Sequence, residues 1–122
     1  NGQYDKAIEN YQQALSIARK LGAENGIAIS LNNIGSTYRS WGKYDKAIEH
    51  YQAALAFEKK LGREDKLSTL LSKIAFMYQL VGEYDKALDH FERALAIEQK
   101  LGRKAKVTNR LNNIGLIYDS LG

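Results

Sequence analysis

The sequence predicts an all-α protein, a solenoid of stacked antiparallel helix pairs without β-strands. Three observations predict this fold class. A short motif recurs every 40 residues, as YDKAIE from Tyr4 and Tyr44 and as YDKALD from Tyr84. Glycines recur every twenty residues, and the 122 residues include no proline. A 40-residue repeat has room for two helices and their turns, and such units bury a continuous core only by stacking on one another.

The glycines mark the predicted helix ends. Glycine just past a helix adopts the left-handed conformation that closes it without steric cost. The spacing predicts six helices, and we expect them to form one array over residues 1–122. Their predicted ranges are residues 4–21, 24–40, 44–61, 64–80, 84–101 and 104–120.

The first, third and fifth helices share one pattern. Each carries an aspartate in its first turn and a lysine in its last turn, which suits the helix dipole. Apolar residues follow at spacings of three and four, as in an amphipathic helix. The shared stripe is alanine, aromatic, alanine: Ala7, Tyr11 and Ala14, then Ala47, Tyr51 and Ala54, then Ala87, Phe91 and Ala94.

The second, fourth and sixth helices share another pattern, and the pentapeptide LNNIG occurs in two of them. Gly35, Ala75 and Gly115 recur at one position in mid-helix. Glycine in mid-helix costs about 1 kcal/mol relative to alanine. We therefore expect a neighbouring helix to approach both glycines too closely for a side chain. The other members of the pattern are Leu31, Ile34 and Tyr38, then Leu71, Ile74 and Tyr78, then Leu111, Ile114 and Tyr118.

These two patterns, three times in register, resemble the tetratricopeptide repeat (TPR) over essentially the whole chain. The resemblance implies a right-handed superhelix with about three repeats. Two features depart from the family pattern. The common proline near the end of the second helix is replaced by Arg19, Lys59 and Gln99, and the period is 40 residues rather than about 34. The longer period is similar to that of kinesin light chains, spindle-orientation adaptors and many bacterial regulators.

The repeats are out of frame, because the chain starts on a second helix of the family pattern and ends on a first helix. We expect Ile114, Ile117 and Leu121 to be partly bare. Two interpretations remain open: the chain is a fragment of a longer array, or its ends stack head to tail on another copy. A head-to-tail contact of this kind is heterologous and can propagate.

The resemblance implies that first-helix residues line a concave, peptide-binding groove. An asparagine amide there offers a donor and an acceptor, which suits the backbone of an extended peptide. Plain solvated polar residues are the alternative. Lys73 and Arg110 are a candidate clamp for an anionic group, with solvated charge as the alternative. The expected groove residues are Asn32, Asn33, Ser36, Arg39, Ser72, Lys73, Phe76, Asn109, Asn112 and Asn113.

Composition argues against catalysis and cofactors. The chain has no cysteine, only two histidines, no glycine-rich phosphate loop and no paired-carboxylate signature. His50 and His90 lack further converging ligands, so we expect no metal site. The missing cysteines fit a reducing compartment, and we expect a cytoplasmic location without membrane association. The sequence therefore predicts a non-enzymatic protein without cofactors.

The net charge is +4, and much of the excess lies in the segment from Lys100 to Arg110. Nucleic-acid binding there would rest on charge alone, without interleaved aromatic residues. We therefore expect a protein-interaction scaffold that binds an extended peptide or a partner helix. The alternative is a self-assembling or linking array inside a larger regulatory protein.

Overall fold

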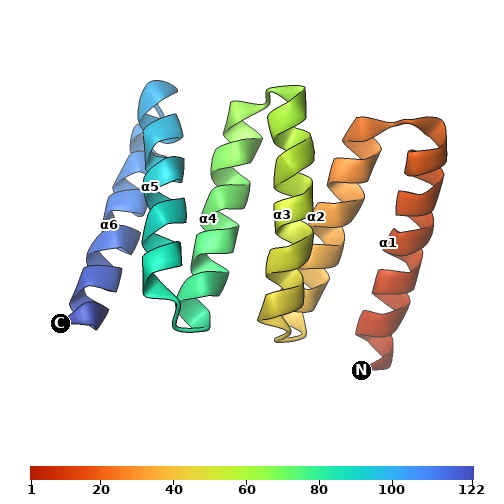
Figure 1. The fold of residues 1–122 in the computed structure, drawn as a ribbon, viewed down its shortest axis with the longest axis horizontal. Helices are drawn as coiled ribbons and strands as arrows, with labels where there is room; N and C mark the ends of the chain where they lie inside the picture. Colours follow the sequence, from red (N-terminus) through yellow and green to blue (C-terminus); the bar gives the residue numbers. More distant parts are fainter. The chain divides into compact units, whose positions relative to one another are not determined.

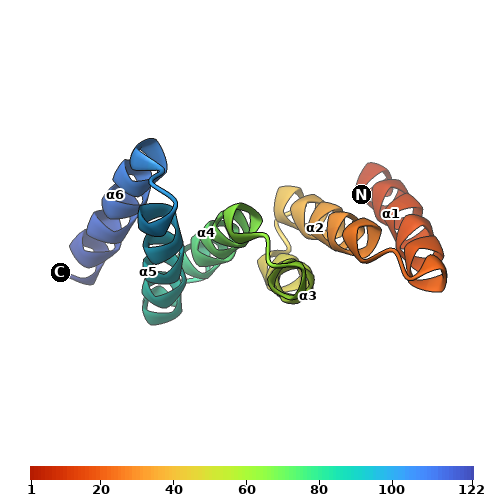
Figure 2. The ribbon, with the colours of Figure 1, turned by 90° about the horizontal axis from the view of Figure 1, so that it is seen from above.

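The computed structural model describes residues 1–122. It contains six α-helices and no strand, and within each of its two units consecutive helices pack against one another and run antiparallel (Figures 1 and 2). This confirms the predicted all-α fold with its six helices. The chain divides into two compact units, Asn1–Gly62 and Arg63–Gly122, each built from three helices. That all six form one continuous array therefore stays a prediction.

Unit 1 contains α1 (Gly2–Leu21), α2 (Glu24–Ser40) and α3 (Tyr44–Leu61), and unit 2 contains α4 (Glu64–Leu80), α5 (Tyr84–Lys100) and α6 (Lys104–Leu121). In each unit the middle helix packs against the other two. No helix has the length and apolar content needed to span a membrane.

The helix ends follow the glycine pattern. Gly22 has a φ of 65°, and its N–H donates to the last turn of α1. The glycines after the other helices also have positive φ, as the spacing predicted. At the other end of α1, the side chain of Asn1 accepts hydrogen bonds from the N–H groups of Gln3 and Tyr4. This cap starts the helix at Gly2, two residues before the predicted Tyr4.

The core of unit 1 confirms one of the two predicted close approaches. Tyr51 of α3 is fully buried, and a Cβ built on Gly35 of α2 would lie 2.7 Å from its ring. The Tyr51 hydroxyl hydrogen-bonds the Ser36 hydroxyl at 2.9 Å, which fixes the ring over the glycine. Glycine is therefore needed at this position, because any side chain would collide with the ring.

The core of unit 2 is centred on Phe91 of α5, which is 1% exposed and packs with Ala75, Ala87 and Ile117. The prediction that Ile117 is partly bare is wrong, because α6 turns this side chain inward against α5. The prediction for Gly115 also fails within this chain, since nothing lies within 4 Å of a Cβ built there.

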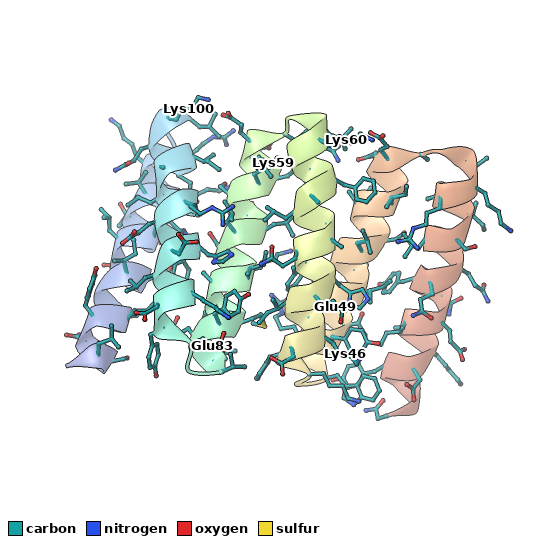
Figure 3. All side chains as sticks on the ribbon, viewed as in Figure 1. Lys46, Glu49, Lys59, Lys60, Glu83 and Lys100 are labelled. Atoms are coloured by element: carbon teal, nitrogen blue, oxygen red, sulfur yellow. The ribbon has the colours of Figure 1, made fainter.

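An ion pair repeated in both units joins the start of one helix to the end of the next. The ammonium of Lys60 lies 2.6 Å from the carboxylate of Glu24 in unit 1. The ammonium of Lys100 lies 2.7 Å from the carboxylate of Glu64 in unit 2. Figure 3 labels both lysines at the last turns of α3 and α5. Each pair is exposed, so we expect a contribution of about 0.2–1 kcal/mol.

Candidate protein-interaction surface

In unit 1, the predicted groove residues lie on α2. Asn32, Asn33 and Ser36 are half-buried, and Arg39 is exposed near the end of the helix. The Ser36 hydroxyl hydrogen-bonds the Tyr51 hydroxyl, and the backbone carbonyl of Asn33 accepts a hydrogen bond from the Thr37 hydroxyl. Ser36 therefore serves the packing of α2 on α3, whereas Arg39 is open to a ligand.

In unit 2, α4 carries the most apolar part of the predicted groove set. Phe76 is 46% exposed, and Leu80, one turn further on, is 47% exposed. Ser72 bonds its own helix through the Ser68 carbonyl, and Lys73 is half-buried. Phe76 is thus a large aromatic side chain at the surface, outside the buried core of unit 2.

The corresponding face of α6 combines amides with one apolar side chain. Asn109 and Asn112 are exposed, whereas Asn113 is half-buried and accepts a hydrogen bond from Arg110 at 3.0 Å. Leu116, 40 residues after Phe76, is 57% exposed. Both helices pack against α5. Unit 2 therefore presents a large apolar side chain beside polar ones at equivalent positions of two helices.

Arg110, one half of the predicted anion clamp, has partners inside unit 2. Its Nε lies 3.3 Å from the carboxylate of Glu98, whose side chain is almost fully buried. Its guanidinium also lies 5.9 Å from the ring centroid of Phe91. A ligand anion would have to compete with Glu98 for this cation. The pairing of Glu98 with Arg110 was not predicted from the sequence.

Glu98 makes the stability of unit 2 depend on pH. Burial raises the pKa of its carboxyl above 4.5, and the charges of Arg110 and Lys106 act in the opposite direction. Between the two pKa values, the folded state therefore holds more of the proton than the unfolded state does. As a result, the contribution of Glu98 to the free energy of unfolding falls as pH rises through the interval between the two pKa values.

We expect Glu98→Gln to remove this pH dependence. The free energy of unfolding, wild type minus variant, should fall as pH rises from 4.5 to the folded-state pKa and stay constant above it. Urea denaturation of both chains from about pH 4 to about pH 7 measures this difference in the free energy of unfolding. Glu92→Gln, at an exposed site on the same helix, is the matched control. Parallel curves for wild type and Glu98→Gln would show that the carboxyl has the same pKa in both states.

Two cations of the basic segment, and both histidines, have partners within their own units. Lys100 pairs with Glu64, and Arg110 pairs with Glu98. His50 and His90 lie against Tyr38 and Tyr78, with ring centroids 5.3 and 5.2 Å apart. No group of three or more potential ligands that could hold a metal ion is present. These histidines therefore belong to the packing of their units.

A surface hollow in unit 1 was not predicted. It lies along α1, and its lining includes Leu15 and Arg19 of α1, Leu31 of α2 and His50 of α3. These residues occupy different repeat positions on three helices, so periodicity gives no signal that they meet. The hollow is open and mixed in polarity, and it is a different surface from the predicted groove residues.

Comparison with known sequences agrees with the repeat pattern. A family model described as tetratricopeptide repeat matches residues 1–60 and 66–122. The chain belongs to the tetratricopeptide repeat family. TPR arrays are protein-interaction scaffolds, and their partners are proteins or peptides. No curated protein sequence matches this TPR chain.

Several solved structures are similar to the chain. The crystal structure of BtubC (BKLC) from P. vanneervenii is 29% identical with a TM-score of 0.87, covering 99% of this chain and 51% of that one. The apo form of RapI is 27% identical with a TM-score of 0.84, covering 95% and 42%. A putative kinesin light chain from Podospora anserina with nearly identical TPR-like repeats is 22% identical with a TM-score of 0.77, covering 97% and 59%, and shows the fold alone. The chain thus spans about half the length of these proteins.

Proposed function

We propose that this TPR chain binds an extended peptide segment of a partner protein on the first-helix faces of its repeats. In unit 2 these are the exposed faces of α4 and α6, and unit 1 has a separate face of this kind on α2. The observation that carries the proposal is the repeated exposure of a large apolar side chain beside polar groups. Phe76 and Leu116 are about half-exposed at equivalent positions, and neither belongs to the buried core of unit 2.

The polar groups around these side chains suit a peptide backbone. Asn109 and Asn112 are exposed, and each amide can donate and accept a hydrogen bond. Lys73 lies one turn before Phe76 and suits an acidic group on the ligand. A partly apolar peptide with an acidic residue fits this surface best. The expectation that Lys73 and Arg110 act together stays a prediction, since Arg110 would have to leave Glu98.

Selection from a displayed random peptide library tests the proposal. The immobilised chain should enrich peptides with an apolar side chain, and Phe76→Glu or Leu116→Glu should weaken their binding at least about tenfold. Ile17→Glu, at an exposed site on α1, is the matched control and should leave binding unchanged. Enriched peptides that bind the Phe76 and Leu116 variants as well as wild type would contradict the proposal.

Two of the sequence-based alternatives stay predictions. Self-association through the terminal helices would make the molar mass grow with concentration, and light scattering across a hundredfold range of concentration measures it. Nucleic-acid binding would have to use the segment from Lys100 to Arg110 and would weaken steeply with salt. Because no set of residues points to a particular reaction, we propose no catalytic step. We also propose that the chain is cytoplasmic.

A further inference from the structure

The two LNNIG pentapeptides of α2 and α6 have the same sequence but different polar neighbours. In α6, the side-chain oxygen of Asn113 accepts a hydrogen bond from the guanidinium of Arg110 at 3.0 Å. In α2, the side chain of Asn33 at the equivalent position makes no hydrogen bond. One of the two equivalent amides is therefore held by the protein, and the other is not.

Arg110 is itself held by two residues of α5. Its Nε lies 3.3 Å from the carboxylate of Glu98, and the side chains of Arg110 and Glu98 are only 16% and 2% exposed. Its guanidinium carbon lies 5.9 Å from the ring centroid of Phe91, in the core of unit 2. These contacts restrict the side chain before it bonds Asn113. The guanidinium is thus a fixed donor rather than a mobile surface charge.

The equivalent residues of unit 1 show why only one amide is held. Arg110 corresponds to Ser30, and Glu98 corresponds to Ala18. Ser30 and Ala18 are both buried, and neither carries a charge. A buried ion pair adds little stability over uncharged residues that pack equally well. Since these positions pack without an ion pair in unit 1, the pair in unit 2 points to a task for Arg110 beyond packing.

The bond from Arg110 decides which atom of the Asn113 amide remains for a ligand. A guanidinium has donors only, so the atom that faces it must be the amide oxygen. The amide nitrogen has no acceptor within the chain. Asn113 is half-buried and lies one turn before Leu116 on the exposed face of α6. It therefore offers N–H donors to a ligand, whereas an amide that turns, such as that of Asn33, can offer either a donor or an acceptor.

We propose that Arg110 is a positioning residue: held by Glu98, it fixes the Asn113 amide so that Asn113 donates to a carbonyl oxygen of the bound peptide. The role of Asn113 toward the peptide rests on the proposed function, whereas the orientation of its amide does not. Arg110 acts through Asn113 in this arrangement, without binding the ligand itself. Because the amide is oriented before the peptide arrives, binding loses less side-chain entropy.

Nuclear magnetic resonance relaxation tests the orientation without any peptide. The order parameters of the side-chain amides are measured on the full chain labelled with ¹⁵N. The value for Asn113 should exceed about 0.6, the upper limit of flexible groups, and should exceed that for Asn33. Arg110→Lys keeps a cation beside Glu98 but replaces the planar fork of donors, so it should lower the Asn113 value. Asn33 is the internal control and should keep its value.

A second variant guards against poor folding of Arg110→Lys. Glu98→Gln removes the anion that holds Arg110, and it should also lower the order parameter of Asn113. Urea denaturation of both variants shows that they fold. If Arg110 served packing alone, these substitutions would change the free energy of unfolding and leave the order parameter of Asn113 unchanged.

Binding of a peptide selected from the library tests the donor role. Asn113→Asp keeps one oxygen for Arg110 but places a second oxygen where the N–H groups were. A peptide carbonyl would then be repelled, and affinity should fall at least about tenfold. Asn112→Asp is the matched control, because it adds the same charge at the neighbouring exposed position. It should change affinity less than about fivefold.

Two results would overturn the inference. An order parameter of Asn113 that neither Arg110→Lys nor Glu98→Gln lowers would show that Arg110 does not fix the amide. Peptide binding that Asn113→Asp leaves unchanged or strengthens would show that Asn113 does not donate to the peptide. If the library yields no binding peptide, the proposed function fails and the donor role fails with it, while the relaxation measurement still decides whether Arg110 orients Asn113.

Discussion

Replacing Phe91 with alanine is expected to lower the free energy of unfolding by about 3–5 kcal/mol. The side chain is 1% exposed and fills the space between α4, α5 and α6. Its removal leaves a cavity lined by Ala75, Ala87 and Ile117, and alanines are too small to collapse into it. Urea denaturation followed by circular dichroism measures the loss.

Tyr11→Ala is the matched control for Phe91→Ala. Tyr11 holds the same repeat position on α1, but its side chain is half-buried, because no helix of the chain covers that face. We expect a loss below about 2 kcal/mol. Trp41, the only tryptophan, lies in unit 1, so its fluorescence follows that unit separately from the whole-chain signal. Equal losses in the two variants would contradict the account of the Phe91 core.

The two LNNIG glycines are expected to respond to the same substitution with opposite signs. Gly35→Ala should destabilise the chain by about 1–3 kcal/mol, because the new methyl group would lie 2.7 Å from the Tyr51 ring. Gly115→Ala should stabilise it by about 0.5–1 kcal/mol, since alanine is the better helix former and the site is open. Thermal and urea denaturation of both variants measure the difference.

The Tyr51→Phe background serves as a control on the mechanism. Without its hydroxyl, the ring is no longer held by Ser36 and can shift away from the added methyl group. At the equivalent place in unit 2, Phe91 packs in one core with Ala75. Gly35→Ala should therefore cost less in that background than in wild type. Stabilisation by Gly35→Ala in the wild-type chain would contradict the close approach of α3 to α2.

Much of the fold could be predicted because it depends on local rules that repeat. Glycines such as Gly22 and Gly42 close their helices through their own φ angles, which need no knowledge of distant partners. The alanine and aromatic stripe of α3 and α5 predicted a packed face, and Ala47, Ala54 and Phe91 are buried.

The errors arise where equivalent residues have different neighbours. Periodicity treats Gly35 and Gly115 alike, yet only Gly35 is covered within the chain. Ile117 was expected to be partly bare and is fully buried, because the sequence pattern does not show which side of α6 meets α5. The pairing of Glu98 with Arg110 does not recur at the equivalent positions of the other repeats, so the repeat pattern did not predict it. The hydrogen bond between Ser36 and Tyr51 was also not predicted, and the assignment of Ser36 to a ligand stays a prediction.

The most direct test of the proposed function is to map a selected peptide onto the chain by nuclear magnetic resonance. The chain is labelled with ¹⁵N, and the shifts of its backbone amides are followed as the peptide is added. Our account predicts that the largest shifts fall around Phe76 of α4 and around Asn112 and Leu116 of α6, with α5 little changed. Shifts concentrated on α5, or in the hollow between α1 and α3, would contradict binding to the first-helix faces.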